Sequence, residues 1–172
     1  DIAEELDRSQ ALLPKGCVPA FLRPPGGCCS DAVRQVAQAR NLAILGWSVD
    51  PRDWSTQDTA AIEKAVLKNV RSGDIVLLHD MSDSSVRAAL DIIDALLAQN
   101  YEIVTVSRLA RLREQKLRPG HSYANFPESP KIPRNSPAFS TLGGGFLLFS
   151  PNSDSIPFQR VMHFDQKSPQ GG

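Results

Sequence analysis

The sequence predicts an α/β fold with parallel strands, because short apolar runs with strand character alternate with segments of helical periodicity over residues 1–113. Residues 42–49 and 75–78 are almost continuously apolar, as expected for strands buried on both faces of a sheet. Each is followed by apolar residues at helical spacing. This order implies right-handed crossovers. The strands that are visible are too few to close a barrel.

The N-terminal elements are expected to be a helix, a short strand and a second helix. Residues 1–13 have helical spacing and acidic residues near their start. The strand over residues 18–22 must stop at the two prolines that follow Arg23, since proline cannot pair in a ladder. Ser30 is the expected N-cap of the second helix, which runs to about residue 40. Its inward-facing residues are expected to be Val33, Val36 and Ala37.

Three more helices are expected further along the chain. The first starts at Thr56 or Thr59 and is closed by Gly73. Ser84 opens the second, and Ser107 caps the third after a strand over residues 101–106. The apolar positions of the second helix are Val86, Leu90, Ile93 and Leu97.

The periodic pattern ends near residue 115. From Lys116 onward, proline recurs among many serine, asparagine and glycine residues. We therefore expect an α/β domain over residues 1–115 and a tail over residues 116–172 that is disordered or loosely packed. One isolated strand-like run, residues 143–149, lies in that tail.

Composition narrows the classes of function. The chain of 172 residues has a net charge of zero and no basic stripe, so no nucleic-acid partner is expected. No apolar run approaches the roughly 20 residues of a membrane span. Cys17, Cys28 and Cys29 lack the spacing of a zinc site. They are expected to be ordinary small buried residues, or to form at most one loop disulfide.

Polar side chains follow three of the strand-like runs. Arg23 follows the first run, Asp50 and Asp53 follow the second, and His79 follows the third. The carboxyl ends of parallel strands gather on one face of the sheet, where active sites form. We therefore expect Arg23, Asp53 and His79 to meet, with Asp53 in hydrogen-bond reach of His79. Each of these residues could instead have a purely structural role. Arg23 could lie at the surface, and His79 could be held at a strand end by hydrogen bonds. Asp50 could cap a turn, and Asp53 could cap the following helix.

The motifs at these strand ends resemble those of the polysaccharide deacetylases, the NodB-homology or carbohydrate esterase family 4 domain. Arg23-Pro24-Pro25-Gly26 resembles the Arg-x-Pro-aromatic motif of that family. Asp50-Pro-Arg-Asp53-Trp54 matches its Asp-x-x-Asp-Trp motif, and Leu77-Leu78-His79 matches its Leu-x-His motif. Order and spacing agree over about residues 1–113. The resemblance implies a distorted (β/α) barrel, to which this chain would contribute the C-terminal half.

The resemblance also implies a reaction, the hydrolysis of the acetamide of N-acetylglucosamine units in peptidoglycan or a chitin-like polysaccharide. His79 would act as general acid, Asp53 would orient it, and Arg23 would hold the catalytic base. Asp50 is a candidate support behind these groups. Gly26 is a substrate-binding candidate through its backbone N–H. Trp54 and Leu77 are candidates for the lining of the acetyl pocket, although both could equally be core residues.

Two further motifs of the family are not found in this chain. They are a Thr-Phe-Asp-Asp-Gly stretch, with the base and one metal ligand, and a His-x-x-x-His, with two more ligands. The resemblance thus implies a divalent metal, with zinc expected, whose ligands are not in this chain. It also implies an N-terminal fragment as partner and an extracellular or cell-envelope location. We expect the chain to be inactive alone.

Two other classes of function stay open. The chain could be non-catalytic, either a truncated remnant or a glycan-binding scaffold. It could instead belong to another amide hydrolase of the same superfamily that acts on a small linear or cyclic amide. Presence of the two missing motifs in the complete protein would separate the leading hypothesis from the non-catalytic one.

Overall fold

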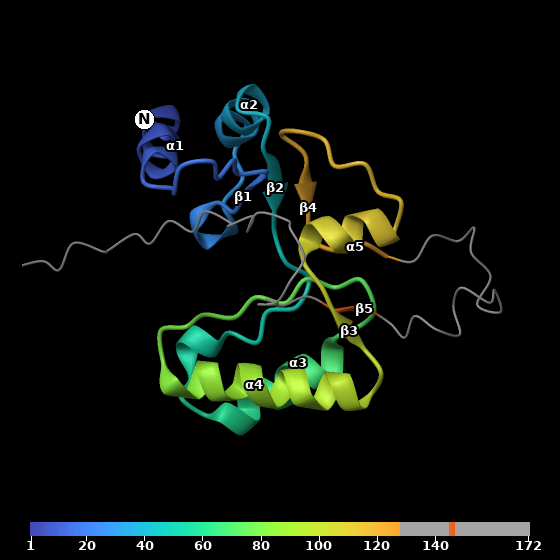
Figure 1. Cartoon of the computed structure of the whole chain (residues 1–172). Coiled ribbons are helices and arrows are strands. Elements are labelled where there is room, and N and C mark those ends of the chain that lie inside the picture. The colour runs from blue at the N-terminus through green and yellow to red at the C-terminus, as the bar shows by residue number, and fades with distance from the viewer. Residues whose placement is uncertain (128–144, 147–172) are drawn as a thin grey trace, which may run out of the picture. The chain divides into compact units, whose positions relative to one another are not determined.

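The computed structural model describes residues 1–127 and 145–146. These residues divide into two compact units, which are described separately (Figure 1). Among the described residues, the first unit holds residues 1–46 and 117–123. The second holds residues 47–116, 124–127 and 145–146.

The first unit contains two helices and a three-stranded parallel sheet. The helices are α1 (Ile2–Ala11) and α2 (Asp31–Ala39). The strands β1 (Phe21–Leu22), β2 (Ala43–Leu45) and β4 (Ser122–Tyr123) lie in the order β1-β2-β4. In the register, Phe21 pairs with Ala43 and Ile44 pairs with Ser122. A 3-10 turn, Pro25–Gly27, follows β1.

The two helices of this unit begin at N-capping side chains. The Asp1 carboxylate accepts a hydrogen bond from the Glu4 amide at 2.8 Å and caps α1. The Ser30 hydroxyl accepts from the Val33 amide at 3.3 Å and caps α2, which confirms that prediction. Ala37 is fully buried, and Val33 and Val36 pack against the core around it. The buried members of this core are Leu6, Leu22, Ala37, Leu42 and Ile44.

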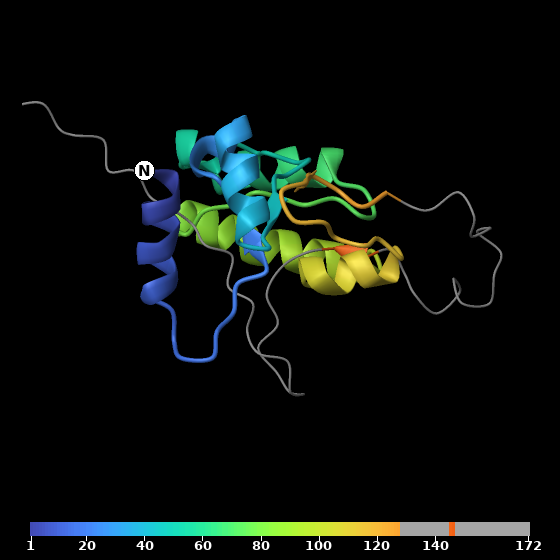
Figure 2. The same cartoon turned by 90° about the horizontal axis from the view of Figure 1, so that it is seen from above.

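The second unit is built around a pair of helices. It contains a 3-10 turn (Asp53–Ser55), α3 (Thr59–Asn69), α4 (Asp83–Ala98) and α5 (Val106–Leu112). Strands β3 (Glu102–Ile103) and β5 (Gly145–Phe146) pair in parallel. Helices α3 and α4 lie side by side (Figure 1 and Figure 2). The apolar cluster between them consists of Val49, Ile62, Val66, Val76, Ala88, Ile92 and Leu96.

The predicted fold class is confirmed, since the described residues form an α/β structure with parallel strands in an open sheet. The predicted strand boundaries are too long. Residues 42–49 contribute β2 only at Ala43–Leu45, and residues 75–78 form a single parallel bridge, Val49 to Val76. Paired main-chain bonds hold this bridge: the Val49 amide donates to Ile75 O at 3.2 Å, and the Leu77 amide donates to Val49 O at 2.9 Å. An apolar run in the sequence thus indicates a buried, extended segment. The length of the regular β-strand within it depends on the neighbouring strands with which it pairs.

Helix α3 starts at Thr59, one of the two predicted positions, with Asp58 as its N-cap. Two other predicted helix starts are wrong by one or two residues. Helix α4 starts at Asp83 with Ser82 as its N-cap, instead of starting at Ser84, and Thr105 caps α5 instead of Ser107. An N-cap side chain accepts from an amide two or three residues further along the chain, and several neighbouring side chains in this sequence have that spacing. Gly73 does not close α3, which ends at its C-cap Val70.

The buried face of α4 also differs from the apolar positions that the sequence suggested. Its buried residues are Ser85, Ala88, Ile92 and Leu96. By contrast, 43% of Val86, 58% of Leu90 and 51% of Leu97 is exposed. Helix α4 has two apolar stripes, and α3 packs on the one that contains the small residues.

The first residues of the expected tail take part in both units. Ser122 and Tyr123 form β4, Asn125 bridges to Asp74, and Phe126 is buried. The division at residue 115 stays a prediction, and residues 128–144 and 147–172 lie outside the described part of the chain. Among the helices that are described, none has the length and apolar character needed to cross a membrane.

Candidate active site

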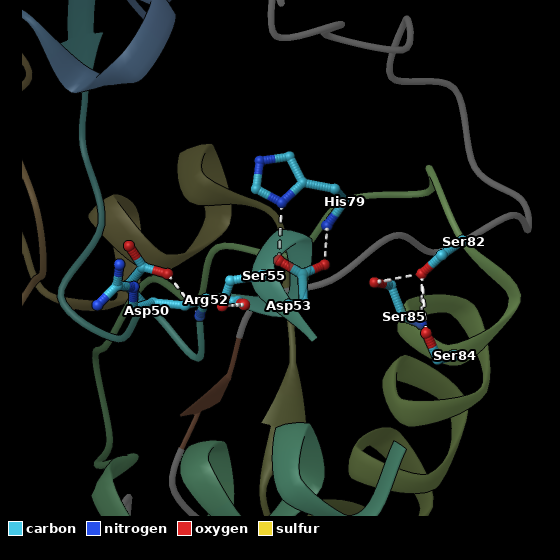
Figure 3. A network of polar contacts seen from close by, with 8 residues as sticks. All are labelled: Asp50, Arg52, Asp53, Ser55, His79, Ser82, Ser84 and Ser85. Carbon is cyan, nitrogen blue, oxygen red and sulfur yellow. Dashed lines mark hydrogen bonds and ion pairs between the residues drawn. The ribbon is translucent and has the colours of Figure 1, made fainter. Parts of the chain in front are cut away.

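The second unit brings Asp53 and His79 into direct contact, as the sequence predicted. Asp53 Oδ1 lies 2.8 Å from His79 Nδ1, and Asp53 Oδ2 accepts a hydrogen bond from the His79 main-chain N–H at 2.8 Å (Figure 3). Both residues come shortly after the Val49–Val76 bridge, on its C-terminal side. Parallel pairing therefore gathers two strand ends that lie 26 positions apart in sequence.

Asp53 is deeply buried, with 1% of its surface exposed, whereas His79 is half-buried. A buried carboxylate needs hydrogen-bond partners, and both of its oxygens have one here. An ionised carboxylate can only accept, so Nδ1 of His79 carries a hydrogen. Nε2 is then the ring atom that can transfer a proton, and in Figure 3 the imidazole extends away from Asp53.

A tight turn over residues 50–55 orients the Asp53 side chain toward His79. Asp50 Oδ1 accepts from the Arg52 amide at 2.8 Å, an Asx turn that Arg52 continues with a left-handed φ of 55°. The Ser55 hydroxyl donates to Arg52 O at 2.7 Å. Asp50 therefore has the turn-capping role that the sequence left as an alternative, and it shapes the loop that presents Asp53.

Trp54 and Leu77, the two predicted wall residues, have different surroundings. Trp54 is 56% exposed, and the Arg52 guanidinium lies 5.3 Å from its ring centroid, a cation–π contact that orients the indole. Leu77 is buried, with 6% exposed. Their contact with an acetyl group stays a prediction.

A cavity of about 350 Å³ lies beside Asp53. The turn after Asp53 provides one wall and the start of α4 provides the other. Its lining residues are Asp53, Trp54, Ser55, Thr56, Gln57, Met81, Ser82 and Ser85. Apart from Asp53 and Trp54, sequence reasoning missed this set. The available signal was the polar and small composition of residues 55–57 and 82–85, directly after two motif ends.

Arg23 and Gly26 belong to the first unit. Arg23 directly follows β1, and its Nε is buried without a hydrogen-bond partner among the described residues. Burial lowers the pKa of the Arg23 guanidinium from its ordinary value. Gly26 has a φ of 59° within the turn after β1, which favours glycine. The predicted meeting of Arg23 with Asp53 and His79 joins residues of different units, so it stays a prediction.

The described residues do not fit the metal site that the resemblance implies. No group of three or more His, Cys, Asp or Glu side chains in residues 1–127 is placed to hold a metal ion. Cys17, Cys28 and Cys29 form no disulfide, and Cys29 Sγ lies 3.5 Å from Ser122 Oγ.

Comparison with known proteins gives consistent relatives. No protein-family model matches the chain. Over 100 residues it is 42% identical to a peptidoglycan-N-acetylglucosamine deacetylase of Bacillus cereus, which corresponds to 55% of this chain and 47% of that protein. The chain thus spans about half the length of this curated relative, and about a quarter of longer ones.

Solved structures agree with this likeness. A family 4 acetyl xylan esterase of Clostridium thermocellum, in complex with cobalt, superimposes with a TM-score of 0.65 and 30% identity, over 73% of this chain and 63% of that one. A family 4 pseudoenzyme of Bacillus anthracis matches with a TM-score of 0.50 and 26% identity, over 60% and 36%. The fold and the motif residues are therefore similar to those of carbohydrate esterase domains. More narrowly, they are similar to part of a polysaccharide deacetylase domain of the NodB-homology, carbohydrate esterase family 4 type.

Proposed function

We propose that the protein containing this chain removes acetyl groups from N-acetylglucosamine units of peptidoglycan or a chitin-like glycan, and that this chain supplies the proton-donor side of the site. The observation that carries the proposal is the buried Asp53 carboxylate on Nδ1 of His79 at 2.8 Å. The names of the curated relatives, which are deacetylases of such glycans, support this substrate class.

The chemistry assigned to this pair is protonation of the leaving group. Water adds to the acetamide carbonyl, the C–N bond breaks, and acetate and a sugar amine form. An amine is a poor leaving group until its nitrogen is protonated, and Nε2 of His79 delivers that proton. Asp53 holds Nδ1–H and stabilises the imidazolium before transfer, as a third group does in triad-like arrangements.

Arg23, Gly26, Trp54 and Leu77 complete the proposal. The Arg23 guanidinium binds the carboxylate of the catalytic base, which explains a buried Nε with no partner in the described residues. The Gly26 N–H faces the oxyanion. Trp54 and Leu77 contact the acetyl methyl group. Trp54 is the stronger candidate of the two, because its indole is exposed whereas Leu77 is buried.

The remaining parts of the site come from outside the described residues. We assign the base and the ligands of a divalent metal, with zinc as the first candidate, to the N-terminal part of a family domain. The exposed apolar side chains on α4, Val86, Leu90 and Leu97, support such a partner because it would cover them. The chain alone is then inactive. Peptidoglycan as substrate places the activity at the cell envelope.

The test replaces His79 with glutamine in the complete protein. Hydrolysis of an N-acetylglucosamine tetramer is compared with hydrolysis of para-nitrophenyl acetate, whose leaving group needs no proton. We expect turnover of the amide to fall by about 10²- to 10⁴-fold and that of the ester to fall far less. Metal content should stay unchanged. An equal loss on both substrates, or loss of metal, would contradict the role. His121→Gln, in the first unit, is the matched control.

A non-catalytic function is the second candidate. One observation favours it: one of the structural relatives is a family 4 pseudoenzyme. Metal titration of the complete protein separates the two proposals. Stoichiometric metal binding with turnover supports the deacetylase, whereas glycan binding without either supports a scaffold.

A further inference from the structure

We propose that Cys28 and Cys29 form a reversible redox site, at which thiol–disulfide exchange joins the two adjacent sulfurs in a vicinal disulfide. Both are free thiols in this structure. They lie in the first unit, between the turn that contains Gly26 and the N-cap of α2, Ser30. The deacetylation chemistry proposed above uses neither sulfur, so this inference goes beyond that function and does not depend on it.

The two thiols differ in their access to solvent. Cys28 is exposed, whereas Cys29 is half-buried and its Sγ lies 3.5 Å from the hydroxyl of Ser122 on β4. A disulfide of the size of oxidised glutathione therefore meets Cys28 first. Cys28 is then the residue that forms the mixed disulfide, and Cys29 is the residue that resolves it.

The contacts of Cys29 suit this second step, in which its sulfur is the nucleophile. Arg34 Nη1 donates to Ser122 Oγ at 3.0 Å, so the hydroxyl can donate its own hydrogen to Cys29 Sγ. Cys29 also directly precedes Ser30, the N-cap of α2, where the positive end of the helix dipole lies. Cysteines that take part in exchange occur in such partly exposed places beside positive charge.

The reaction needs a disulfide as oxidant and balances in two steps. The Cys28 sulfur attacks one sulfur of the small-molecule disulfide, whose S–S bond breaks, and one thiol leaves. The Cys29 sulfur then attacks the Cys28 sulfur and releases the second thiol. The protons of the two cysteine thiols end on the two released thiols, and the small-molecule disulfide takes up the two electrons. An excess of reduced thiol reverses both steps.

The main chain between the two sulfurs must change when they are joined. Cys28 is extended, with φ of −70° and ψ of 110°, and successive side chains of an extended segment point to opposite sides. Ring closure also breaks the contact between Cys29 and Ser122. A disulfide that strains its own backbone is readily reduced, so the pair is a switch and not a structural cross-link. Its redox state is thereby coupled to the conformation of the turn that holds Gly26.

The experiment equilibrates the complete protein with defined ratios of reduced to oxidised glutathione. Iodoacetamide then traps the remaining thiols, and mass spectrometry maps residues 28–29. Both alkylation sites should disappear in one transition, and the peptide should lose two hydrogens without gaining glutathione. Cys29→Ser should stop at a glutathione adduct on Cys28. Cys28→Ser should react at least about ten-fold more slowly than the parent, because Cys29 is half-buried. Cys17→Ser is the matched control and should leave the transition unchanged.

Ser122 is assigned as a positioning residue for the second step. Ser122→Ala removes the hydroxyl beside Cys29 Sγ, so ring closure should slow by about three- to ten-fold and the adduct on Cys28 should accumulate. Ser122→Thr keeps a hydroxyl and should close at the rate of the parent. Equal closure rates for the two variants would overturn this role of Ser122.

A joint transition of Cys28 and Cys29, with these effects of the cysteine variants, supports the redox site. A stable glutathione adduct in the parent, a disulfide that includes Cys17, or no oxidation at any glutathione ratio would overturn it. Turnover is measured separately. A protein that forms this disulfide but does not deacetylate refutes the proposed function alone, and the reverse result refutes the redox site alone.

Discussion

Asp53 binds both the side chain and the main chain of His79. One carboxylate oxygen lies 2.8 Å from Nδ1, and the other lies 2.8 Å from the main-chain nitrogen. This two-point contact fixes the position of the histidine backbone as well as the tautomer of its ring. A single buried carboxylate therefore links the stability of the strand ends to the chemistry proposed for them.

Asp53→Asn should reduce both stability and activity. A carboxamide has one oxygen, so it cannot accept from the ring and the main chain of His79 as a carboxylate does. We expect the free energy of unfolding to fall by about 1–3 kcal/mol. Turnover in the complete protein should fall by about 10²-fold or more, since the wrong ring tautomer becomes stable. Denaturant unfolding and deacetylation rates measure the two effects.

Asp50→Asn is the matched control for that variant. Its carboxylate accepts one hydrogen bond, from the Arg52 amide, and an asparagine oxygen accepts it equally well. Stability and turnover should change little. A loss as large as that of Asp53→Asn would show that Asp50 acts beyond the turn.

Gly73→Ala should destabilise the second unit strongly. Gly73 has a φ of 94°, and an added Cβ would lie 2.0 Å from the carbonyl oxygen of Phe126. Gly16 has a φ of 85° but open space around the same position, so Gly16→Ala provides the control for backbone strain alone. We expect about 1 kcal/mol for Gly16→Ala and at least 2 kcal/mol more for Gly73→Ala. Similar unfolding midpoints would refute the packing of residue 126 on this turn.

Ser82→Ala should cost more than Ser30→Ala, although both remove an N-cap. Ser30 accepts one capping hydrogen bond, from the Val33 amide, at an exposed position. Ser82 caps α4 and also donates to the hydroxyl of Ser85, which is 2% exposed. We expect about 1 kcal/mol for Ser30→Ala and about 2 kcal/mol for Ser82→Ala, because the buried hydroxyl loses its partner. Urea unfolding curves measure the difference.

Low pH should weaken the ion pair between Asp7 of α1 and Arg40 at the end of α2. Asp7 accepts from Nε and Nη2 of Arg40 at 2.9 and 2.8 Å, and this bonding lowers the pKa of the Asp7 carboxyl. A lowered folded-state pKa gives stability that is complete above the unfolded value, about 3.9, and is lost as pH falls through the folded value.

Asp7→Asn tests that pH dependence through the thermal midpoint measured from pH 7 to pH 2. The midpoint of the variant should lie slightly below that of the parent at neutral pH, and the two curves should converge in acid. High salt should shrink the neutral-pH gap, because the pair is exposed. A gap that widens in acid would contradict the assignment.

The sequence by itself determined the fold class, the boundaries of α2 and the Asp53–His79 contact. Each depends on short-range chemistry or on a rule of topology. Ser30 caps α2 through an amide three residues away, and two prolines stop the strand before them. Asp53 and His79 meet because parallel pairing gathers strand ends on one side, wherever they lie in the sequence.

Only the tertiary structure decided which face of α4 is buried and which residues line the cavity. The sequence of α4 presents Leu90 and Leu97 as strongly as Ile92 and Leu96, and hydrophobicity alone cannot rank the two stripes. Ala88 allows close approach of α3, so packing selects its stripe. The same holds for Ser122 and Phe126, whose segment has no periodicity. Their burial and pairing depend on β2 and Gly73, which are distant in sequence and supply the partners that irregular chain lacks on its own.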